Sequence, residues 1–426
     1  MYSQSVKGSY LKRIVDEQLA EYLSASGAVL IEGVKWCGKT STAKEKAASI
    51  LLMQDPKKVK QNIALANTDP DILLEGSTPR LIDEWQLAPA IWDAVRNTVD
   101  ERRMPGQFIL TGSSLPADDP TRHSGTGRIF RMMMRPMSLY ESGESNGSVS
   151  LGDLFKGSAK VRGVFDRSIR EIGAALIRGG WPGSIGVNEK VAILNAQMYV
   201  EAIINTDISV VDGVSRNPTA VRELLRSLSR NISTQSTMST IRNDMLGDDD
   251  RISDKTVSSY INALRRIFVV EDLPAWNPSL RSKTAVRESP KRHFADPSIA
   301  AAVMRLSADG LMEDFKTFGL LFESMCIRDL RVYSQAIDGE VFHYRDKNNL
   351  EADAVIHLRD GRWCAAEIKL GSDSIDDGAK NLLKLKNKID LGKMKEPSFL
   401  MVITSSGYAY KRDDGVFVVP IGCLKN

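Results

Sequence analysis

A glycine-rich segment near the N-terminus combines the residue types that bind the phosphates of a nucleotide. Its spacing, G-x-x-x-x-G-K-[ST], lets the backbone turn so that successive N–H groups point inward at a phosphate chain. Lys39 is predicted to reach the β- and γ-phosphates of ATP, and the hydroxyl of Thr40 is predicted to bind Mg²⁺. The members of the segment are Gly33, Val34, Lys35, Trp36, Cys37, Gly38, Lys39, Thr40 and Ser41.

The flanking sequence decides between such a phosphate loop and a chance glycine turn before a helix. Residues 28–32 form a short apolar run that is typical of a buried strand, and residues 41–48 favour a helix. The motif requires a strand, a loop and a helix in that order. Because the order is met, the phosphate loop is the favoured interpretation.

Two acids end a second apolar run, residues 80–85. Asp83 is predicted to hold Mg²⁺ through its waters, and Glu84 is predicted to orient or deprotonate the water that attacks the γ-phosphate. The alternative is a strand end with two solvated acids. The position of this pair behind a phosphate loop favours the nucleotide site.

A third run, residues 107–114, ends in small hydroxyl residues. In a parallel sheet such an end lies in the ligand crevice, so Thr111 or Ser113 is predicted to sense the γ-phosphate. An ordinary turn after a strand is the alternative. Beyond it, Arg128 is predicted to neutralise transition-state charge, at its own site or at that of a neighbouring subunit. A solvated surface arginine fits the sequence equally well.

The last quarter of the chain holds a second group of acids. A predicted hairpin over residues 349–369 places Asp353 on its first strand and Glu367 and Lys369 on one face of its second. Glu323, in an expected helix, is predicted to join them. These carboxylates are predicted to form a possible second Mg²⁺ site, at which the lysine would orient a water for phosphodiester cleavage. A structural salt-bridge cluster in a degenerate domain is the alternative.

The middle of the chain is expected to be mainly helical. Residues 141–215 are interpreted as a helical linker or lid, and residues 216–300 as three short helices and a strand pair, the pattern of a winged helix. The polar face of its third helix could enter a DNA major groove. Packing between domains is an equally good role for such a module.

In the order of these motifs the whole chain resembles the bacterial and archaeal AAA-like P-loop ATPases of the DUF4143 type. The resemblance implies an ATPase core, a winged helix and a C-terminal PD-(D/E)xK domain, which is restriction-endonuclease-like. The chain departs from many relatives in the middle of its phosphate loop, where the bulky Trp36 is expected to stack on the site or seal it. The resemblance rests on Gly33 to Thr40, Leu81 to Glu84, Phe108 to Ser114, Gly179 to Pro182, and Asp353, Glu367 and Lys369.

Length and composition limit the remaining choices. The 426 residues predict an α/β protein of several domains, with boundaries at 1–140, 141–215, 216–300 and 301–426. A net charge of +3 excludes a polycation that coats nucleic acid, and four scattered cysteines argue against a disulfide framework or a zinc site. No signal peptide or membrane span is evident, so a cytoplasmic protein without a membrane partner is expected.

Three functions compete on these grounds. The leading one is an ATPase that couples nucleotide state to DNA or to a protein partner through its C-terminal domains. The second is an ATP-regulated, Mg²⁺-dependent DNA endonuclease. The third is a nucleotide switch or scaffold without hydrolysis. Assembly into a homo-oligomer is compatible with each.

Overall fold

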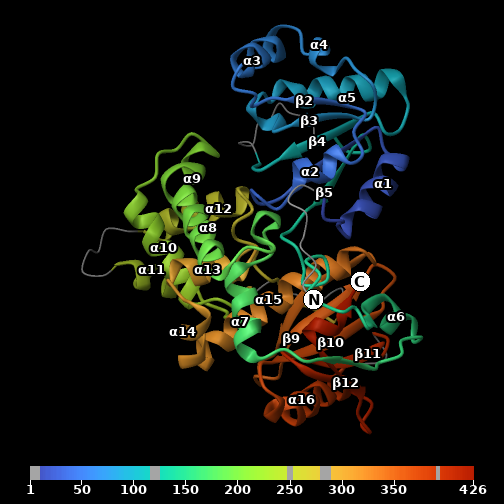
Figure 1. Ribbon diagram of the computed structural model, residues 1–426, viewed down its shortest axis with the longest axis vertical. Helices are drawn as coiled ribbons and strands as arrows, with labels where there is room; N and C mark the ends of the chain where they lie inside the picture. The colour runs from blue at the N-terminus through green and yellow to red at the C-terminus, as the bar shows by residue number, and fades with distance from the viewer. Residues whose placement is uncertain (1–9, 116–124, 247–252, 279–288, 390–393) are drawn as a thin grey trace. The chain divides into compact units, whose positions relative to one another are not determined.

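The computed structural model describes residues 10–115, 125–246, 253–278, 289–389 and 394–426. Its contacts divide the chain into two compact units (Figure 1). The first takes in the chain up to Pro136, with Thr206–Ser215 and Asn262–Val269. The second takes in Met137–Asn205, Arg216–Ile261 and Val270–Asn426. This grouping differs from the four consecutive ranges that the sequence predicts, because most of the expected linker belongs with the C-terminal part of the chain.

The first unit is built on a sheet of five parallel strands in the order β2-β3-β4-β1-β5. The middle strands β1 and β4 are buried along most or all of their length, as apolar runs predict for a parallel sheet covered on both faces. The expected parallel α/β sheet is confirmed. Its strands are β1 (Ala28–Glu32), β2 (Ser49–Leu52), β3 (Arg80–Asp83), β4 (Phe108–Gly112) and β5 (Ile129–Met133).

Helix α5 (Ala90–Arg102) packs on this sheet through its apolar stripe. Ile91, Trp92 and Val95 are buried in one cluster with Leu30 and Phe108 of the central strands. Burying a large apolar side chain contributes about 1.5–3 kcal/mol, so this contact fixes the strands that lead into the site. The other helices of the unit are α1 (Val15–Ala25), α2 (Lys39–Lys44), α3 (Val59–Thr68), α4 (Asp71–Leu74), η1 (Trp85–Leu87) and α9 (Ile208–Val210).

The strand order brings the predicted nucleotide residues to one edge of this sheet. The phosphate loop follows β1, Asp83 ends β3, and Thr111 is in β4, which pairs with both of these strands. The carboxyl ends of parallel strands share an edge, where ligands bind in such folds.

The second unit contains a mixed seven-stranded sheet in the order β7-β12-β13-β11-β10-β9-β8. Strands β8, β9 and β10 form an antiparallel meander, and β11 pairs in parallel with β10. The hairpin predicted between β9 and β10 is confirmed, with Gly361 at a φ of 84° in its turn. The strands are β7 (Gly163–Phe165), β8 (Gly339–Arg345), β9 (Glu351–Leu358), β10 (Trp363–Lys369), β11 (Phe399–Thr404), β12 (Gly407–Lys411) and β13 (Phe417–Pro420).

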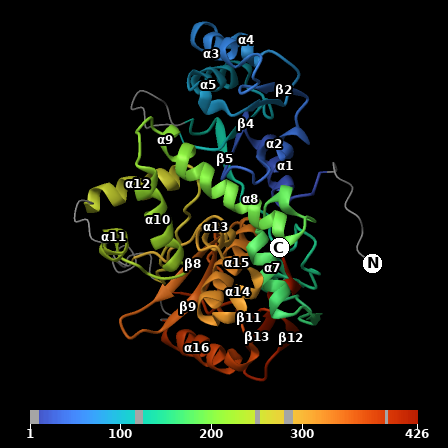
Figure 2. The ribbon, with the colours of Figure 1, turned by 60° about the vertical axis from the view of Figure 1, so that its left-hand side comes forward.

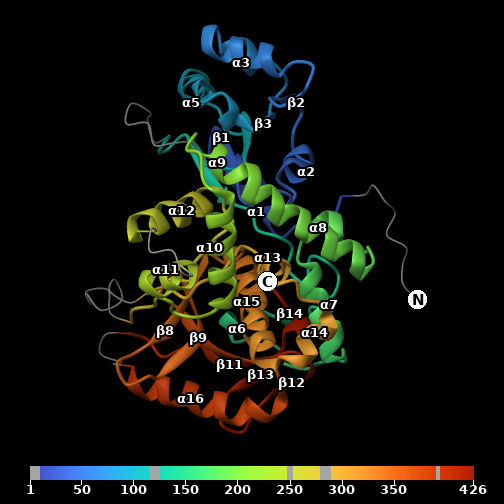
Figure 3. The same ribbon diagram turned by 90° about the vertical axis from the view of Figure 1, so that its left-hand side faces the viewer.

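Two helices cover the faces of this sheet (Figure 3). Helix α16 (Ile375–Lys388) makes the crossover that the parallel pair of β10 and β11 requires, and its Leu382 and Leu385 pack against Trp363 and Val402. Helix α15 (Phe315–Gln335) contacts β8, β9 and β10. The order α15, β8, β9, β10, α16, β11 is the mixed C-terminal α/β domain that the sequence predicts.

The expected linker, up to Asn205, is a structural part of the second unit. Its strand β7 pairs with β12, and α7 (Ile169–Arg178) and α8 (Glu189–Ala202) pack on each other. Gly180 fits where no other residue would, because a Cβ there would lie 2.1 Å from the carbonyl oxygen of Met137. Its N–H donates to Asp296 at 2.9 Å. The glycine motif after α7 is therefore a packing point rather than a flexible joint.

Three helices occupy the range predicted for a winged helix, and α10 and α11 lie side by side (Figure 2). They are followed by antiparallel bridges from Val270 to Phe294 and from Leu273 to Lys291. The strand expected from residue 268 is only such a bridge, because Phe268 has a φ of 60°. These elements agree with a winged helix, and that assignment stays a prediction. The helices are α10 (Pro218–Arg230), α11 (Met238–Leu246) and α12 (Asp254–Arg266).

No helix in the described ranges combines the length and the apolar character that a bilayer span needs. All four cysteines lie in these ranges, where they are buried and free. The shorter elements of the second unit are β6 (Val149–Ser150), α6 (Leu151–Lys156), α13 (Pro297–Val303), α14 (Ala308–Glu313) and β14 (Leu424–Lys425).

Candidate functional site

The loop between β1 and α2 has the backbone that its sequence predicts. Gly33 and Gly38 adopt φ angles of 152° and 104°, and a Cβ on Gly33 would lie 2.1 Å from the carbonyl oxygen of Met134. The buried ammonium group of Lys39 donates to the carbonyl oxygens of Gly33, at 2.8 Å, and Val34, at 2.9 Å. A phosphate chain inside the loop would take the place of these two carbonyl partners.

Asp83 joins the loop helix to the neighbouring strand. The hydroxyls of Thr40 and Thr111 each donate to Oδ1 of Asp83 at 2.6 Å, and Nε2 of Gln54 lies 3.5 Å from its Oδ2. Asp83 is only 1% exposed. Because the hydroxyl of Thr111 is bound to Asp83, the structure gives it a positioning contact, and its role as a γ-phosphate sensor stays a prediction.

Glu84 is held in a backbone conformation that residues other than glycine seldom adopt. Its φ is 57° and its N–H donates to Thr111 Oγ1 at 3.2 Å. Its carboxylate accepts a hydrogen bond from Ser113 Oγ at 2.8 Å and another from Nε2 of Gln86. Residues held in sparsely populated backbone regions cluster at functional sites. The contacts therefore support a specific task for this carboxylate, beside Asp83 at the edge of the sheet.

The remaining loop residues point in different directions. The ammonium group of Lys35 forms an ion pair with Asp207 at 2.6 Å. Trp36 has a φ of 67° and is 53% exposed, so it does not seal the loop in this structure. Cys37 is buried, with its thiol 3.3 Å from a carbonyl oxygen, and Ser41 is exposed on α2.

The predicted acids of the second unit also come together. Nζ of Lys369 lies 2.6 Å from Glu367 and 3.9 Å from Asp353. A further lysine, Lys291, donates to Glu323 at 2.7 Å and to Asp353 at 3.1 Å. The four residues that the sequence singled out thus form one cluster, together with a cation that it did not single out.

This arrangement is not the second Mg²⁺ site that the sequence predicts. Within the described residues, no group of three or more histidine, cysteine, aspartate or glutamate side chains is placed to hold a metal ion. The physical reason is that ammonium groups take the place between the carboxylates: Lys291 bridges Glu323 and Asp353, and Lys369 contacts Glu367. The geometry matches the alternative of a structural salt-bridge cluster.

Comparison with protein families agrees with both halves of this description. Residues 25–143 match the model of an AAA domain, and residues 318–424 match a domain of unknown function, DUF4143. The chain thus carries a match to an AAA domain followed by a match to DUF4143, the combination that the resemblance predicts. Between them, residues 169–310 match another domain of unknown function, DUF8612. At the level of the family, the AAA domain supports ATP binding and hydrolysis.

Two of the solved structures that match the chain resemble it distantly. A Walker-type ATPase of Pyrococcus abyssi is 14% identical with a TM-score of 0.41, covering 71% of this chain and 99% of its own. A DNA polymerase III gamma subunit-related protein of Thermotoga maritima is 9% identical with a TM-score of 0.22, covering 59% and 99%. At these scores neither carries information about activity. A search among curated proteins finds no match.

In the AAA domain, Arg128 lies at the wrong edge of the sheet for a role at its own phosphate loop. Parallel pairing sets Ala28, the first residue of β1, beside Ile129, the first of β5. Arg128 therefore precedes the strands, whereas the loop follows them, about 16 Å further on at 3.3 Å per residue. Its guanidinium pairs with Asp100 at 2.8 Å. The predicted role at its own site is contradicted, and the role in a neighbouring subunit stays a prediction.

Two residues that hold parts of the AAA site in place were not predicted from the sequence. The buried Arg13 donates to the carbonyl oxygens of Cys37, at 2.7 Å, and Arg135, at 2.8 Å, and so joins the N-terminal segment to the phosphate loop. Gln86 binds the carboxylate of Glu84. Nothing in the local pattern marks Arg13, because its partners are distant in sequence. Gln86 stands two residues after a predicted catalytic acid, which was the only available indication.

The shifted pKa values of two acids in the C-terminal cluster predict that the stability of the protein depends on pH. Burial raises the pKa of Glu323 to about 8, and burial together with the charge of Asp353 raises that of Glu367 to about 7. A glutamic acid side chain ordinarily titrates near 4.5. Between that pH and the raised pKa values, the folded state therefore binds more protons than the unfolded state. Stability therefore falls as pH rises through this window.

We expect the melting temperature to be higher at about pH 5 than at about pH 8.5, and the difference to shrink in Glu323→Gln. Part of the difference remains in this variant, because Glu367 is unchanged. The exposed Glu313→Gln serves as the control and should behave as the wild type does. If the melting temperature of Glu323→Gln fell between these two pH values as much as that of the wild type, this carboxyl would not titrate as described.

Proposed function

We propose that the protein binds and hydrolyses Mg²⁺-ATP at the loop from Gly33 to Ser41, and that nucleotide state controls the binding of DNA or a protein partner by the C-terminal unit. The observation that carries the catalytic half is the convergence of Lys39, Thr40, Asp83 and Glu84 at one edge of a parallel sheet. The match to an AAA domain supports the same assignment.

The oxygens beside the loop fit a magnesium ion. The hydroxyl of Thr40 and the carboxylate of Asp83 are 2.6 Å apart, and hydroxyl and carboxylate oxygens are the ligands that Mg²⁺ prefers. When bound, the ion would neutralise charge that develops on the β- and γ-phosphate oxygens. Thr40 and Asp83 are the residues that would hold it.

The other groups of the site would bind the phosphates and activate the attacking water. Lys39 supplies a fixed positive charge to the phosphates, and the loop glycines bring backbone N–H groups to them. Glu84 accepts the proton of the attacking water or orients that water. Ser113 and Gln86 hold its carboxylate in place before ATP binds.

The ion pair between Lys35 and Asp207 supports the coupling half of the proposal. Lys35 belongs to the phosphate loop, and Asp207 lies in Thr206–Ser215, a segment of the first unit that is flanked on both sides by segments of the second. A phosphate chain in the loop competes with Asp207 for the charge of Lys35. ATP binding is therefore expected to release Asp207, the last residue of η3 (Ile203–Asp207), the π-helical segment that directly follows α8.

The coupling is tested by replacing Asp207 with Asn and measuring ATP turnover with and without single-stranded DNA. In the wild type we expect DNA to change turnover. In Asp207→Asn we expect unstimulated turnover to persist and the response to DNA to fall by a factor of about 1.4 to 5, since a single exposed or partly exposed ion pair is worth about 0.2–1 kcal/mol. Asp69→Asn, an exposed change in the same unit, is the control. An unaltered response to DNA in Asp207→Asn would show that the ion pair between Lys35 and Asp207 does not couple ATP to DNA.

We assign no cleavage of DNA to the C-terminal cluster. Asp353, Glu367 and Lys369 do converge as a nuclease would require, but Lys291 pairs with two of the carboxylates that would have to bind the metal. The coulombic effect of Glu323 and Asp353 raises the pKa of Lys291 despite its burial, so this lysine stays charged at neutral pH. The arrangement favours a structural role.

A further inference from the structure

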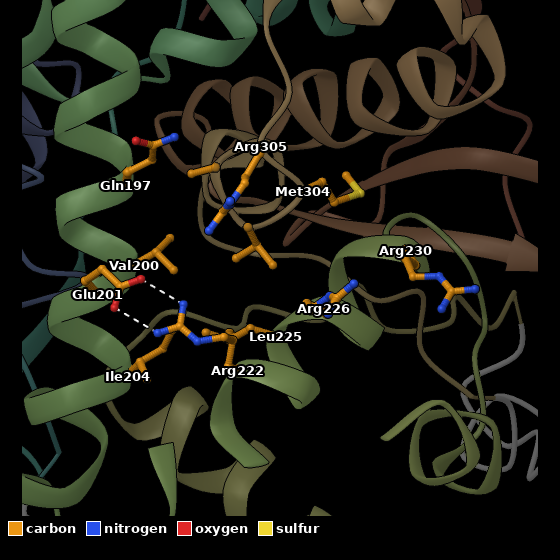
Figure 4. Close-up of a pocket in the computed structure, with 12 residues that line it drawn as sticks. Gln197, Val200, Glu201, Ile204, Arg222, Leu225, Arg226, Arg230, Met304 and Arg305 are labelled. Atoms are coloured by element: carbon orange, nitrogen blue, oxygen red, sulfur yellow. Dashed lines mark hydrogen bonds and ion pairs between the residues drawn. The ribbon is translucent and has the colours of Figure 1, made fainter. Parts of the chain in front are cut away.

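A basic pocket opens in the second unit between α8, α10 and the segment after α13 (Figure 4). Its volume is about 830 Å³, which lies within the range of ligand sites. Four arginines line it, Arg222, Arg226, Arg230 and Arg305, against a single acid, Glu201. The lining therefore carries an excess of three positive charges, although the chain as a whole is close to neutral.

The one acid is already engaged. The carboxylate of Glu201 accepts hydrogen bonds from Nη1 and Nη2 of Arg222 at 2.8 and 3.0 Å. Arg226, Arg230 and Arg305 are exposed, and the structure gives none of them a hydrogen bond or ion pair to a described side chain. The hydrogen bonds from Arg222 lower the pKa of the Glu201 carboxyl and the charge of Arg305 helps to lower it, but one carboxylate cannot balance four guanidinium groups.

Three of the arginines form a row along one helix. Arg222, Arg226 and Arg230 are four residues apart on α10, so their side chains share a face and follow one another at about 6 Å. Like charges at this spacing repel each other, and only Arg222 is relieved by a partner. Arg305 reaches into the pocket from the segment after α13 (Figure 4). A ligand with negative charges spaced along a chain would relieve the repulsion.

The rest of the lining is mainly apolar. Val200 and Ile204 of the α8 side, Leu225 of α10, and Val303 and Met304 contribute aliphatic surface beside the arginines. A free inorganic anion would leave this surface uncovered. A ligand that alternates phosphates with less polar groups fits both parts of the lining.

We propose that this pocket binds the sugar–phosphate backbone of a single-stranded nucleic acid. The row from Arg222 to Arg230 extends over about 12 Å of helix, longer than the phosphates of one nucleotide, so it fits successive phosphates of a strand. A single strand can enter a pocket of this size, whereas a stiff duplex cannot. The assignment rests on the proposed function only in taking DNA as the partner class, and it does not depend on the phosphate loop.

The test is fluorescence anisotropy of a labelled oligothymidylate with the full-length protein, without ATP and over a series of salt concentrations. We expect Arg226→Ala/Arg305→Ala to weaken binding about tenfold or more at low salt. The slope of log affinity against log salt should fall by about 1.4, since each lost phosphate contact of a single strand accounts for about 0.7. Glu201→Gln, which frees Arg222, should strengthen binding.

The matched control is Arg359→Ala/Lys384→Ala, which removes the same charge from exposed positions outside the pocket and should bind as the wild type does. Equal losses in both double variants would show a non-specific charge effect and would overturn the proposal. So would an unchanged affinity in Arg226→Ala/Arg305→Ala. The Lys39→Ala variant separates the two sites, because it should bind the oligonucleotide normally while it loses ATP. Displacement of the oligonucleotide from Lys39→Ala by ATP at equal phosphate concentration would show a free-nucleotide site instead of a strand site.

Discussion

A Glu84→Gln variant is expected to bind Mg²⁺-ATP with nearly the affinity of the wild type and to hydrolyse it about 10²- to 10⁴-fold more slowly. The amide has almost the shape of the carboxylate and can still accept hydrogen bonds from Ser113 and Gln86. It cannot take a proton from the attacking water. Binding and turnover should therefore separate in this variant.

The measurement pairs steady-state phosphate release with ATP binding by calorimetry. Glu101→Gln, an exposed change at the end of α5, is the control and should leave both quantities unaltered. If Glu84→Gln turned over ATP as fast as the wild type, Glu84 would not be the base. If the wild type also bound ATP without hydrolysing it, the non-hydrolysing switch would be the correct function.

Arg328→Met is expected to cost the second unit about 3–5 kcal/mol of its free energy of unfolding, the range observed when one partner of a buried ion pair is removed. The guanidinium lies between two fully buried acids, 2.9 Å from Asp296 and 2.7 Å from Asp329. Those acids in turn accept the N–H groups of Gly180 and Leu139. The variant leaves two buried carboxylates without their cation.

Urea unfolding followed by tryptophan fluorescence measures this loss. Arg170→Met is the matched control: Arg170 also pairs with an acid, Asp309 at 2.6 Å, but both side chains are exposed. An exposed pair contributes about 0–1 kcal/mol, so this variant should stay within that range of the wild type. Similar stabilities for the two variants would contradict the account of the buried cluster.

The phosphate site could be predicted because its chemistry is local in sequence. The loop glycines and Lys39 occupy fixed positions between a strand and a helix, and Asp83 and Glu84 end an apolar run whose edge follows from the rule for parallel sheets. Arg128 was misplaced for the converse reason. The sequence put it beside a strand but did not say at which end, and the register with β1 decides that.

The contacts that the sequence did not reveal join residues far apart along the chain. Lys291 precedes Asp353 by 62 residues, and Lys35 precedes Asp207 by 172. No pattern of spacing links such pairs, since their meeting depends on how whole elements pack. The same holds for Gly180, which reads as a helix breaker in sequence but is required by the close approach of Met137.

The central claim is that the loop between β1 and α2 holds the phosphates of ATP against Lys39. Isothermal titration of Mg²⁺-ATP into the wild type and into Lys39→Ala tests it most directly, with Lys44→Ala, exposed at the end of the same helix, as the control. We expect saturable binding to the wild type and to Lys44→Ala, and a loss of about 30-fold or more in Lys39→Ala, because the phosphates lose a buried charge partner. A folded wild type that takes up no ATP, or equal affinities for the wild type and Lys39→Ala, would contradict the account.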